Sequence, residues 1–220
     1  MQISDVLKFM IPEEFGIDED DNFANNSMEE VMDQIDNTDG DIITAWGVSQ
    51  FVIIGANWDN VVKIPFKGMF FWDSDFDIYE FKPFRYCKDY CARGYHIYEE
   101  AVEEGIEELF AEMDILGYTP DGTPVYTQEK ISMTACDCSL DDVKYGTPET
   151  LEKARELKTT VYCPFLGEWV SAAIDCYGIE KFKKMLDFLT KRNLQDFHSE
   201  NYGYRYDGTP CLIDYSDWIE

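Results

Sequence analysis

Four side chains near the end of the chain have types and a spacing that suit catalysis. Asp196-Phe197-His198 is followed by Asn201, five residues after the first aspartate, and Asp214 comes thirteen residues later. A carboxylate beside a hydroxyl group can accept or orient its proton. An asparagine and a second carboxylate offer the oxygen ligands that Mg²⁺ prefers in proteins. Thirteen residues suffice for one short hairpin that returns Asp214 to Asn201.

The elements around these residues are predicted to hold them together. Gly178 to Arg192 has the pattern of an amphipathic helix with Phe182, Met185, Leu186 and Leu189 inward, and it ends just before the loop. Tyr202 to Tyr206 and Pro210 to Tyr215 are strand-like and flank Asp207-Gly208, as in a hairpin. Further helices are predicted over 27–35, 89–104, 148–158 and 167–176.

The first half of the chain is predicted to be mostly β. Short runs of β-branched and aromatic residues, separated by turn residues, predict an antiparallel meander over 42–46, 50–54 and 61–66. A further hairpin is predicted over 109–116 and 124–131, and 132–147 is predicted to be a loop. Residues 67–88 are aromatic and irregular, so we expect an insertion that packs on the sheet. The fold class is therefore α+β, with a helical C-terminal half.

The order of these features resembles the protein-kinase-like superfamily. Val61-Val62-Lys63-Ile64 lies on the third predicted strand, as the V-A-I-K lysine does, and the loop and Asp214 follow in the order of D-x-x-x-x-N and D-F-G. The Asp-x-His form is most similar to the aminoglycoside- and choline-phosphotransferase branch. It is also similar to short kinase-like proteins of phages and other mobile elements. The resemblance spans about residues 42–216.

The resemblance implies a bilobal kinase-like fold and a set of site residues. The implied parts are an acidic N-terminal extension (1–41), an antiparallel-sheet N-lobe (42–131, with the insertion 67–88) and a small, truncated helical C-lobe with the catalytic loop (132–220). Mg²⁺ and ATP are the implied cofactors. Asp196 would be the catalytic carboxylate, Lys63 would pair with phosphates, and Asn201 and Asp214 would bind the metal. His198 would position the acceptor or a phosphate.

The resemblance also implies further contacts with the nucleotide. Gly47 and Ser49 stand in the turn that would cover the phosphates, and Gln128 ends the fifth strand, where adenine would be contacted. Glu99 is the expected helix partner of Lys63.

The sequence departs from the family pattern in ways that bear on function. No G-x-G-x-x-G is present, the residues ahead of Asp196 are Leu194-Gln195 instead of His-Arg, and Asp214 is followed by Tyr-Ser. Six residues follow Asp214, so an activation segment is missing from this chain. These departures favour a small-molecule acceptor of unknown identity. They also leave open a catalytically inactive, pseudokinase-like protein.

The net charge of the chain favours the second hypothesis, a binding protein. The 220-residue chain has 18 Lys and Arg against 45 Asp and Glu, a net charge of −27. This argues against direct binding of nucleic acid or of an anionic membrane surface. It suits an acidic phage or mobile-element factor that binds a basic protein or mimics nucleic acid. Seven scattered cysteines and the lack of an export signal or a long apolar run predict a cytoplasmic protein.

Five of the cations gather close to the loop, and their role is left open: Lys181, Lys183, Lys184, Lys191 and Arg192. They can form the solvated face of a helix. Alternatively, they can offset the repulsion between an acidic chain and ATP.

Overall fold

The computed structural model describes residues 42–46, 50–65, 68–73, 78–83, 90–118, 122, 124–139, 141 and 143–216. In this part the fold is mixed α+β, with antiparallel sheets and four α-helices, which confirms the predicted class. The extension 1–41, with its predicted helix over 27–35, lies outside the described residues. None of the described helices is both long and apolar enough to cross a membrane.

Contacts divide the described chain into two compact units. The sheet unit holds the residues up to Arg93 together with Met113–Glu129, and the helical unit holds Gly94–Glu112 and the residues from Lys130 onward. The first boundary falls inside helix α3 (Tyr90–Glu103).

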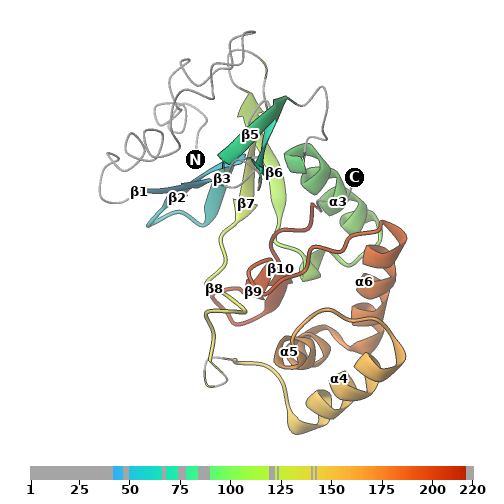
Figure 1. The fold of residues 1–220 in the computed structure, drawn as a ribbon. Coiled ribbons are helices and arrows are strands. Elements are labelled where there is room, and N and C mark those ends of the chain that lie inside the picture. Colours follow the sequence, from blue (N-terminus) through green and yellow to red (C-terminus); the bar gives the residue numbers. More distant parts are fainter. Residues whose placement is uncertain are drawn as a thin grey trace. The chain divides into compact units, whose positions relative to one another are not determined.

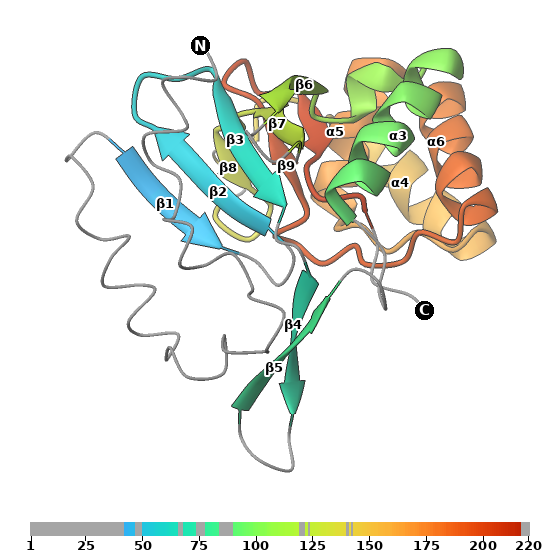
Figure 2. The same cartoon turned by 90° about the horizontal axis from the view of Figure 1, so that it is seen from above.

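The sheet unit is built on five antiparallel strands in the order β1-β2-β3-β7-β6. The first three form the predicted meander, and Figure 2 shows them side by side. Their β-branched and aromatic residues favour strands because such side chains pack well on a pleated surface. The strand bounds are β1 Ile42–Trp46, β2 Gln50–Gly55, β3 Asn60–Pro65, β6 Met113–Tyr118 and β7 Pro124–Glu129.

The aromatic stretch after β3 is more regular than the sequence predicted. Strands β4 (Gly68–Asp73) and β5 (Ile78–Pro83) pair antiparallel through all six positions, so an irregular conformation was the wrong prediction for them. Figure 2 shows them as a twisted two-stranded ribbon. The reason is strand propensity: aromatic side chains favour the extended backbone, even in β4, where polar and apolar residues do not alternate; in β5 they do.

The helical unit combines helices with a small sheet, as Figure 1 shows. Its three antiparallel strands have the order β10-β9-β8. The helix and hairpin predictions for this part are confirmed, but the predicted loop 132–147 contains the two-residue strand β8. The elements are η3 Glu107–Leu109, β8 Met133–Thr134, α4 Pro148–Thr160, α5 Gly167–Tyr177, α6 Ile179–Lys191, β9 Tyr202–Tyr204 and β10 Pro210–Leu212.

Aromatic rings fill the core of the helical unit and fix β9. Phe165 lies 4.8 Å from Trp169 and 5.0 Å from Tyr202, centroid to centroid. The Trp169 indole Nε1–H donates to the Gly203 carbonyl at 2.9 Å. Because a buried indole N–H needs an acceptor, this bond ties α5 to β9 at one defined position. Strand β9 begins directly after Asn201, so the core positions the end of the candidate loop.

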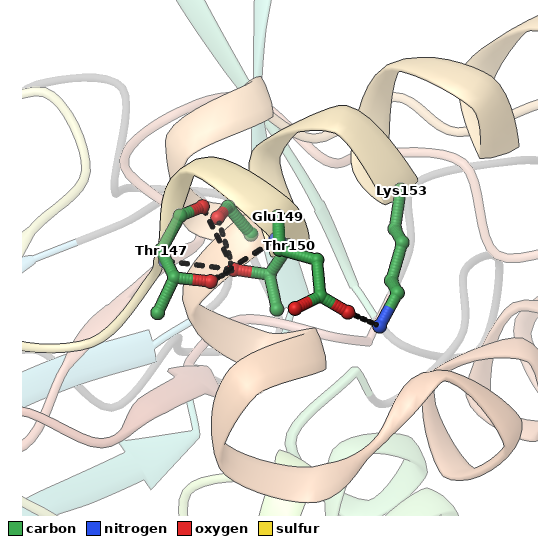
Figure 3. A network of polar contacts seen from close by, with 5 residues as sticks. Thr147, Glu149, Thr150 and Lys153 are labelled. Atoms are coloured by element: carbon green, nitrogen blue, oxygen red, sulfur yellow. Dashed lines mark hydrogen bonds and ion pairs between the residues drawn. The ribbon is translucent and has the colours of Figure 1, made fainter.

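The start of α4 is held by a network of hydroxyl groups (Figure 3). Thr147 and Thr150 form a reciprocal capping box, with Pro148 in the first turn. The Thr150 hydroxyl also lies 2.9 Å from the Ser171 hydroxyl of α5, and this contact is buried. The network satisfies the amides of Thr147 and Thr150 and joins α4 to α5.

Candidate functional site

The loop after α6 alternates buried anchors with accessible polar groups. Asn193 takes a left-handed backbone conformation with φ 55°, and the Leu194 amide donates to the Leu189 carbonyl at 3.0 Å, which ends the helix. Leu194 and Phe197 are buried in the core of the helical unit. Asp196, between them, is half-buried. The two anchors fix the backbone on either side of the candidate catalytic carboxylate.

Asn201 joins the two aspartates of the candidate site. Its amide Nδ2 donates to the backbone carbonyl of Asp196 at 2.8 Å. Its own carbonyl accepts the amides of Ile213 at 2.8 Å and Asp214 at 3.3 Å. Only 8% of Asn201 is exposed, so these bonds lie in a sheltered place. The hairpin therefore returns Asp214 to Asn201, as its length predicted.

The side chains at this junction are of types that can ligate Mg²⁺. The Asn201 Nδ2 is engaged with Asp196, so the amide can offer its oxygen outward, and that oxygen accepts no hydrogen bond from the described residues. Asp214 is half-buried, and one carboxylate oxygen accepts the Ser216 hydroxyl at 3.1 Å. One carboxylate and one amide are hard oxygen ligands that leave other positions to phosphate and water. Groups of three or more His, Cys, Asp or Glu ligands are not found within the described ranges.

His198 lies between two carboxylates. Its Nε2 is 4.0 Å from the Asp196 carboxylate, and its Nδ1 is 3.9 Å from that of Glu200. The Glu200 amide points at Nδ1 at 3.4 Å, which favours the tautomer with the proton on Nε2. In that form the imidazole presents its N–H on the side of Asp196. The side chain is 52% exposed, so it can also reach a bound molecule.

The hairpin that carries Asp214 is fastened at its turn and on its side. Burial raises the pKa of Tyr202 on β9. The Leu166 amide donates a hydrogen bond to the Tyr202 hydroxyl at 3.1 Å, which acts in the opposite direction. At the turn, the backbone amide and hydroxyl of Thr209 donate to Asp207 and hold the pKa of that carboxyl below its usual range. The Arg205 guanidinium donates to the carbonyls of Glu108 at 2.9 Å and Phe110 at 2.8 Å. Sequence reasoning missed this arginine, because its partners lie about a hundred residues earlier.

Lys63 lies in the middle of the sheet unit. Strand β3 runs between β2 and β7, and Lys63 is opposite Val52 on one side and Tyr126 on the other. The residue is 8% exposed. Its ammonium group makes no hydrogen bond or ion pair with any residue in the described part of the chain. A lysine can bury its apolar stem while its ammonium group keeps contact with water, so the low exposure of the residue describes the stem.

The other predicted nucleotide contacts are distributed over both units. Gln128 is 2% exposed on β7, opposite Val61. Glu99 belongs to the helical unit, and its carboxylate contacts His96 at 3.0 Å and the Tyr95 hydroxyl at 2.9 Å. These two bonds, the His96 bond first, lower the pKa of Glu99. Gly47 and Ser49 lie outside the described residues.

Most of the basic cluster on α6 is paired with glutamates. Lys181 lies 2.7 Å from Glu108, and Lys184 lies 3.2 Å from Glu104. Arg192 pairs with Glu100, and its guanidinium stacks 3.6 Å from the centroid of the Phe188 ring. These ion pairs join α6 to α3 and to the segment after it. These three residues of the cluster therefore form an interface within the helical unit. Lys183 lies on the solvated face that the sequence predicted, and it pairs with Glu180 of its own helix at 3.1 Å.

Comparison with known proteins leaves the site to be judged from its own geometry: no protein-family model and no curated protein matches this chain.

Proposed function

We propose that this chain is a bilobal, kinase-like phosphotransferase that uses Mg-ATP. The observation that carries the proposal is the position of Asn201, whose side chain binds the backbone of Asp196 while its carbonyl binds the amide of Asp214. Asn201 thus bonds to the backbone of both aspartates, and the three residues are of the types expected for a proton acceptor and two metal ligands. Chain spacing alone would not require Asn201 to bond to both aspartates.

Each residue at the junction has a role that its surroundings support. When bound, Mg-ATP supplies the phosphoryl group and a cation that neutralises phosphate charge. Asn201 and Asp214 would hold the metal through one amide and one carboxylate oxygen. Asp196 would orient the hydroxyl of the acceptor and take its proton, because its backbone is fixed while its side chain keeps access to solvent. His198 would add a hydrogen-bond donor beside that carboxylate.

Lys63 supports the same function from the sheet unit. Its ammonium group makes no ion pair with the described residues. An anionic phosphate would pair with this ammonium group, which is the role that the kinase-like resemblance gives this lysine. We extend the proposal to a small-molecule acceptor, because the Asp196-Phe197-His198 segment is most similar to the loop of the aminoglycoside- and choline-phosphotransferase branch.

The proposal is tested by ADP formation from Mg-ATP, with water or a fractionated small-molecule extract as acceptor. We expect Asp196→Ala to lower the rate by about 100-fold or more, the scale of a lost general base, and to leave Mg-ATP binding intact. Asp187→Ala, which removes an exposed carboxylate from α6, serves as the matched control. Equal rates for the wild type and Asp196→Ala would contradict the proposed role.

A second candidate function is a catalytically inactive, acidic interaction protein. The favouring observation is that Lys181, Lys184 and Arg192, three of the 18 cations, are already paired with glutamates in a chain of net charge −27. Such a protein would bind a basic protein partner through a salt-sensitive interface. Salt-sensitive binding that persists in Asp196→Ala, without Mg-ATP binding, would favour this function over the first.

A further inference from the structure

The segment after α3 runs beside the strand that leads to Asp214. The Ala111 amide donates to the Leu212 carbonyl at 2.7 Å, and Phe110 pairs with Leu212 as a parallel bridge. All three residues are fully buried. This segment therefore supports the backbone two residues before Asp214.

The same alanine also holds the residue after Asp214. The Tyr215 hydroxyl donates to the Ala111 carbonyl at 2.8 Å, in a buried bond that spans 104 residues of sequence. The Tyr215 ring meets Phe110 edge-on, with centroids 5.2 Å apart and planes at 84°. Both polar groups of Ala111 are thus used, one on each side of Asp214.

Asp214 itself has weaker restraints than its neighbours. Its amide is 3.3 Å from the Asn201 carbonyl, longer than a typical N–H···O bond. Its carboxylate is held by the Ser216 hydroxyl at 3.1 Å, and Ser216 is only half-buried. The direction of the carboxylate must therefore depend on the backbone at Leu212 and Tyr215.

We propose that Tyr215 is a positioning residue, and that its hydrogen bond to Ala111 acts as a latch that aims the Asp214 carboxylate at the metal. This inference rests on the proposed function, because the metal is the one that Asn201 and Asp214 would share. A phenylalanine at position 215 would keep the ring contact with Phe110 and leave the buried Ala111 carbonyl without its donor. The Tyr215→Phe variant therefore distinguishes the effect of the hydroxyl hydrogen bond from the effect of ring packing.

The latch also connects the end of α3 to the metal site. The segment that receives Tyr215 is continuous with η3, and Arg205 of the hairpin donates to the carbonyls of Glu108 and Phe110 in the same segment. Arg205 and Tyr215 therefore hold residues 108–111 from two sides. We expect residues 108–112 and 211–216 to respond together when metal and nucleotide bind.

Binding of Mn²⁺ in the presence of ATP, followed by electron paramagnetic resonance, tests the latch. We expect Tyr215→Phe to weaken Mn²⁺ binding by about threefold to tenfold, the factor that one net hydrogen bond provides, and to leave metal-free ATP binding unchanged. Tyr204→Phe is the matched control, because it removes a buried tyrosine hydroxyl that contacts Cys138 in the same unit. The control should lose stability without losing Mn²⁺ affinity.

A second measurement needs no variant. Hydrogen exchange of the wild-type chain should slow in peptides covering 108–112 and 211–216 when Mn²⁺ and ATP are added together. Unchanged Mn²⁺ affinity in Tyr215→Phe, or protection confined to 211–216, would overturn the latch and leave the proposed function standing. A wild-type chain that binds no Mn²⁺ with ATP would overturn both.

Discussion

Single residues decide how closely the hairpin of the candidate site can pack. Gly203 follows Tyr202 on β9 and lies against β8, where its backbone approaches Met133 and Thr134. A Cβ atom at this position would come within 2.9 Å of the Thr134 Cα and closer still to the Met133 carbonyl. The sequence could not show this, since a glycine in a strand pattern marks a close approach without naming the partner.

Gly203→Ala should therefore destabilise the chain. We expect a loss of about 1–3 kcal/mol in the free energy of unfolding, because a rigid backbone lies where the added methyl group must fit. Chemical denaturation measures the effect. Gly167→Ala is the control, because a Cβ at Gly167 meets nothing within 4 Å. Equal stability of the two variants would contradict the packing of β8 on β9.

The residues of the candidate site could be predicted from the sequence, but the residues that hold them in place could not. The spacing of Asp196, Asn201 and Asp214 predicted a hairpin that returns the last to the second, and the backbone bonds confirm that return. Tyr215 and Arg205 carried no such signal, because they bind main-chain carbonyls about 95 to 104 residues away. Every residue has a backbone carbonyl, so the sequence does not identify which carbonyl accepts the hydrogen bond from Arg205 or Tyr215.

At the scale of elements, local patterns predicted most helices and strands of the described chain. Helix α6 buries Phe182, Met185, Leu186 and Leu189, the residues that its periodicity placed inward. Ribbon β4–β5 was missed although Tyr79-Glu80-Phe81-Lys82 of β5 alternates as a strand does; the apolar run of β4, Met69-Phe70-Phe71-Trp72, does not alternate. The ion pairs from α6 and Arg192 to Glu100 of α3 and to Glu104 and Glu108 after it were also missed, since helical periodicity locates a charged face without identifying the segment that it meets.

The capping network at the start of α4 gives a prediction for one element. Thr147→Ala removes the hydroxyl that accepts the Thr150 amide at 3.1 Å, so it should cost about 0.5–2 kcal/mol of stability. Thr159→Ala is the control, because the exposed Thr159 hydroxyl lies near the other end of the helix, bonded to the Glu156 carbonyl. Thermal denaturation should rank Thr147→Ala clearly below Thr159→Ala. The reverse order would show that the cap does not hold α4.

The ion pair between Lys181 and Glu108 predicts a pH effect. The hydrogen bond from Lys181 is the main cause that lowers the pKa of Glu108 from 4.5. The pair therefore stabilises the fold above pH 4.5, and this stabilisation is lost as pH falls through the lowered pKa of the folded state. Glu108→Gln should cost at most about 1 kcal/mol near pH 7, a difference that disappears in acid.

Denaturation at several pH values measures that difference. Glu152→Gln, which breaks an exposed pair with Arg155 on the same helix, controls for the loss of a charge without a contact between elements. A stability difference for Glu108→Gln that stays constant from pH 7 to strongly acid conditions would exclude the pair as its cause.

At the scale of the whole molecule, contacts group the chain differently from its linear order. The sequence suggested a change of lobe near residue 131, and the contacts place Gly94–Glu112 with the residues from Lys130 onward. The physical reason is burial: Ile106, Leu109 and Phe110 belong to the hydrophobic core of the helical unit. Apolar residues show that a segment is buried, and they do not show which core receives it.

The proposed function requires a working site for Mg-ATP that depends on Asp214. The most direct test is the melting temperature of the wild type and Asp214→Ala, with and without Mg-ATP, and with ATP alone. Ligand at about 100 times its dissociation constant adds about 2.7 kcal/mol of stability, which corresponds to roughly 5–10 °C for a chain of this size. Asp187→Ala, in the exposed part of α6, should behave as the wild type.

We expect a metal-dependent shift of that size in the wild type and its loss in Asp214→Ala. A wild-type melting temperature that millimolar Mg-ATP does not change, or an equal shift in Asp214→Ala, would contradict the proposed function.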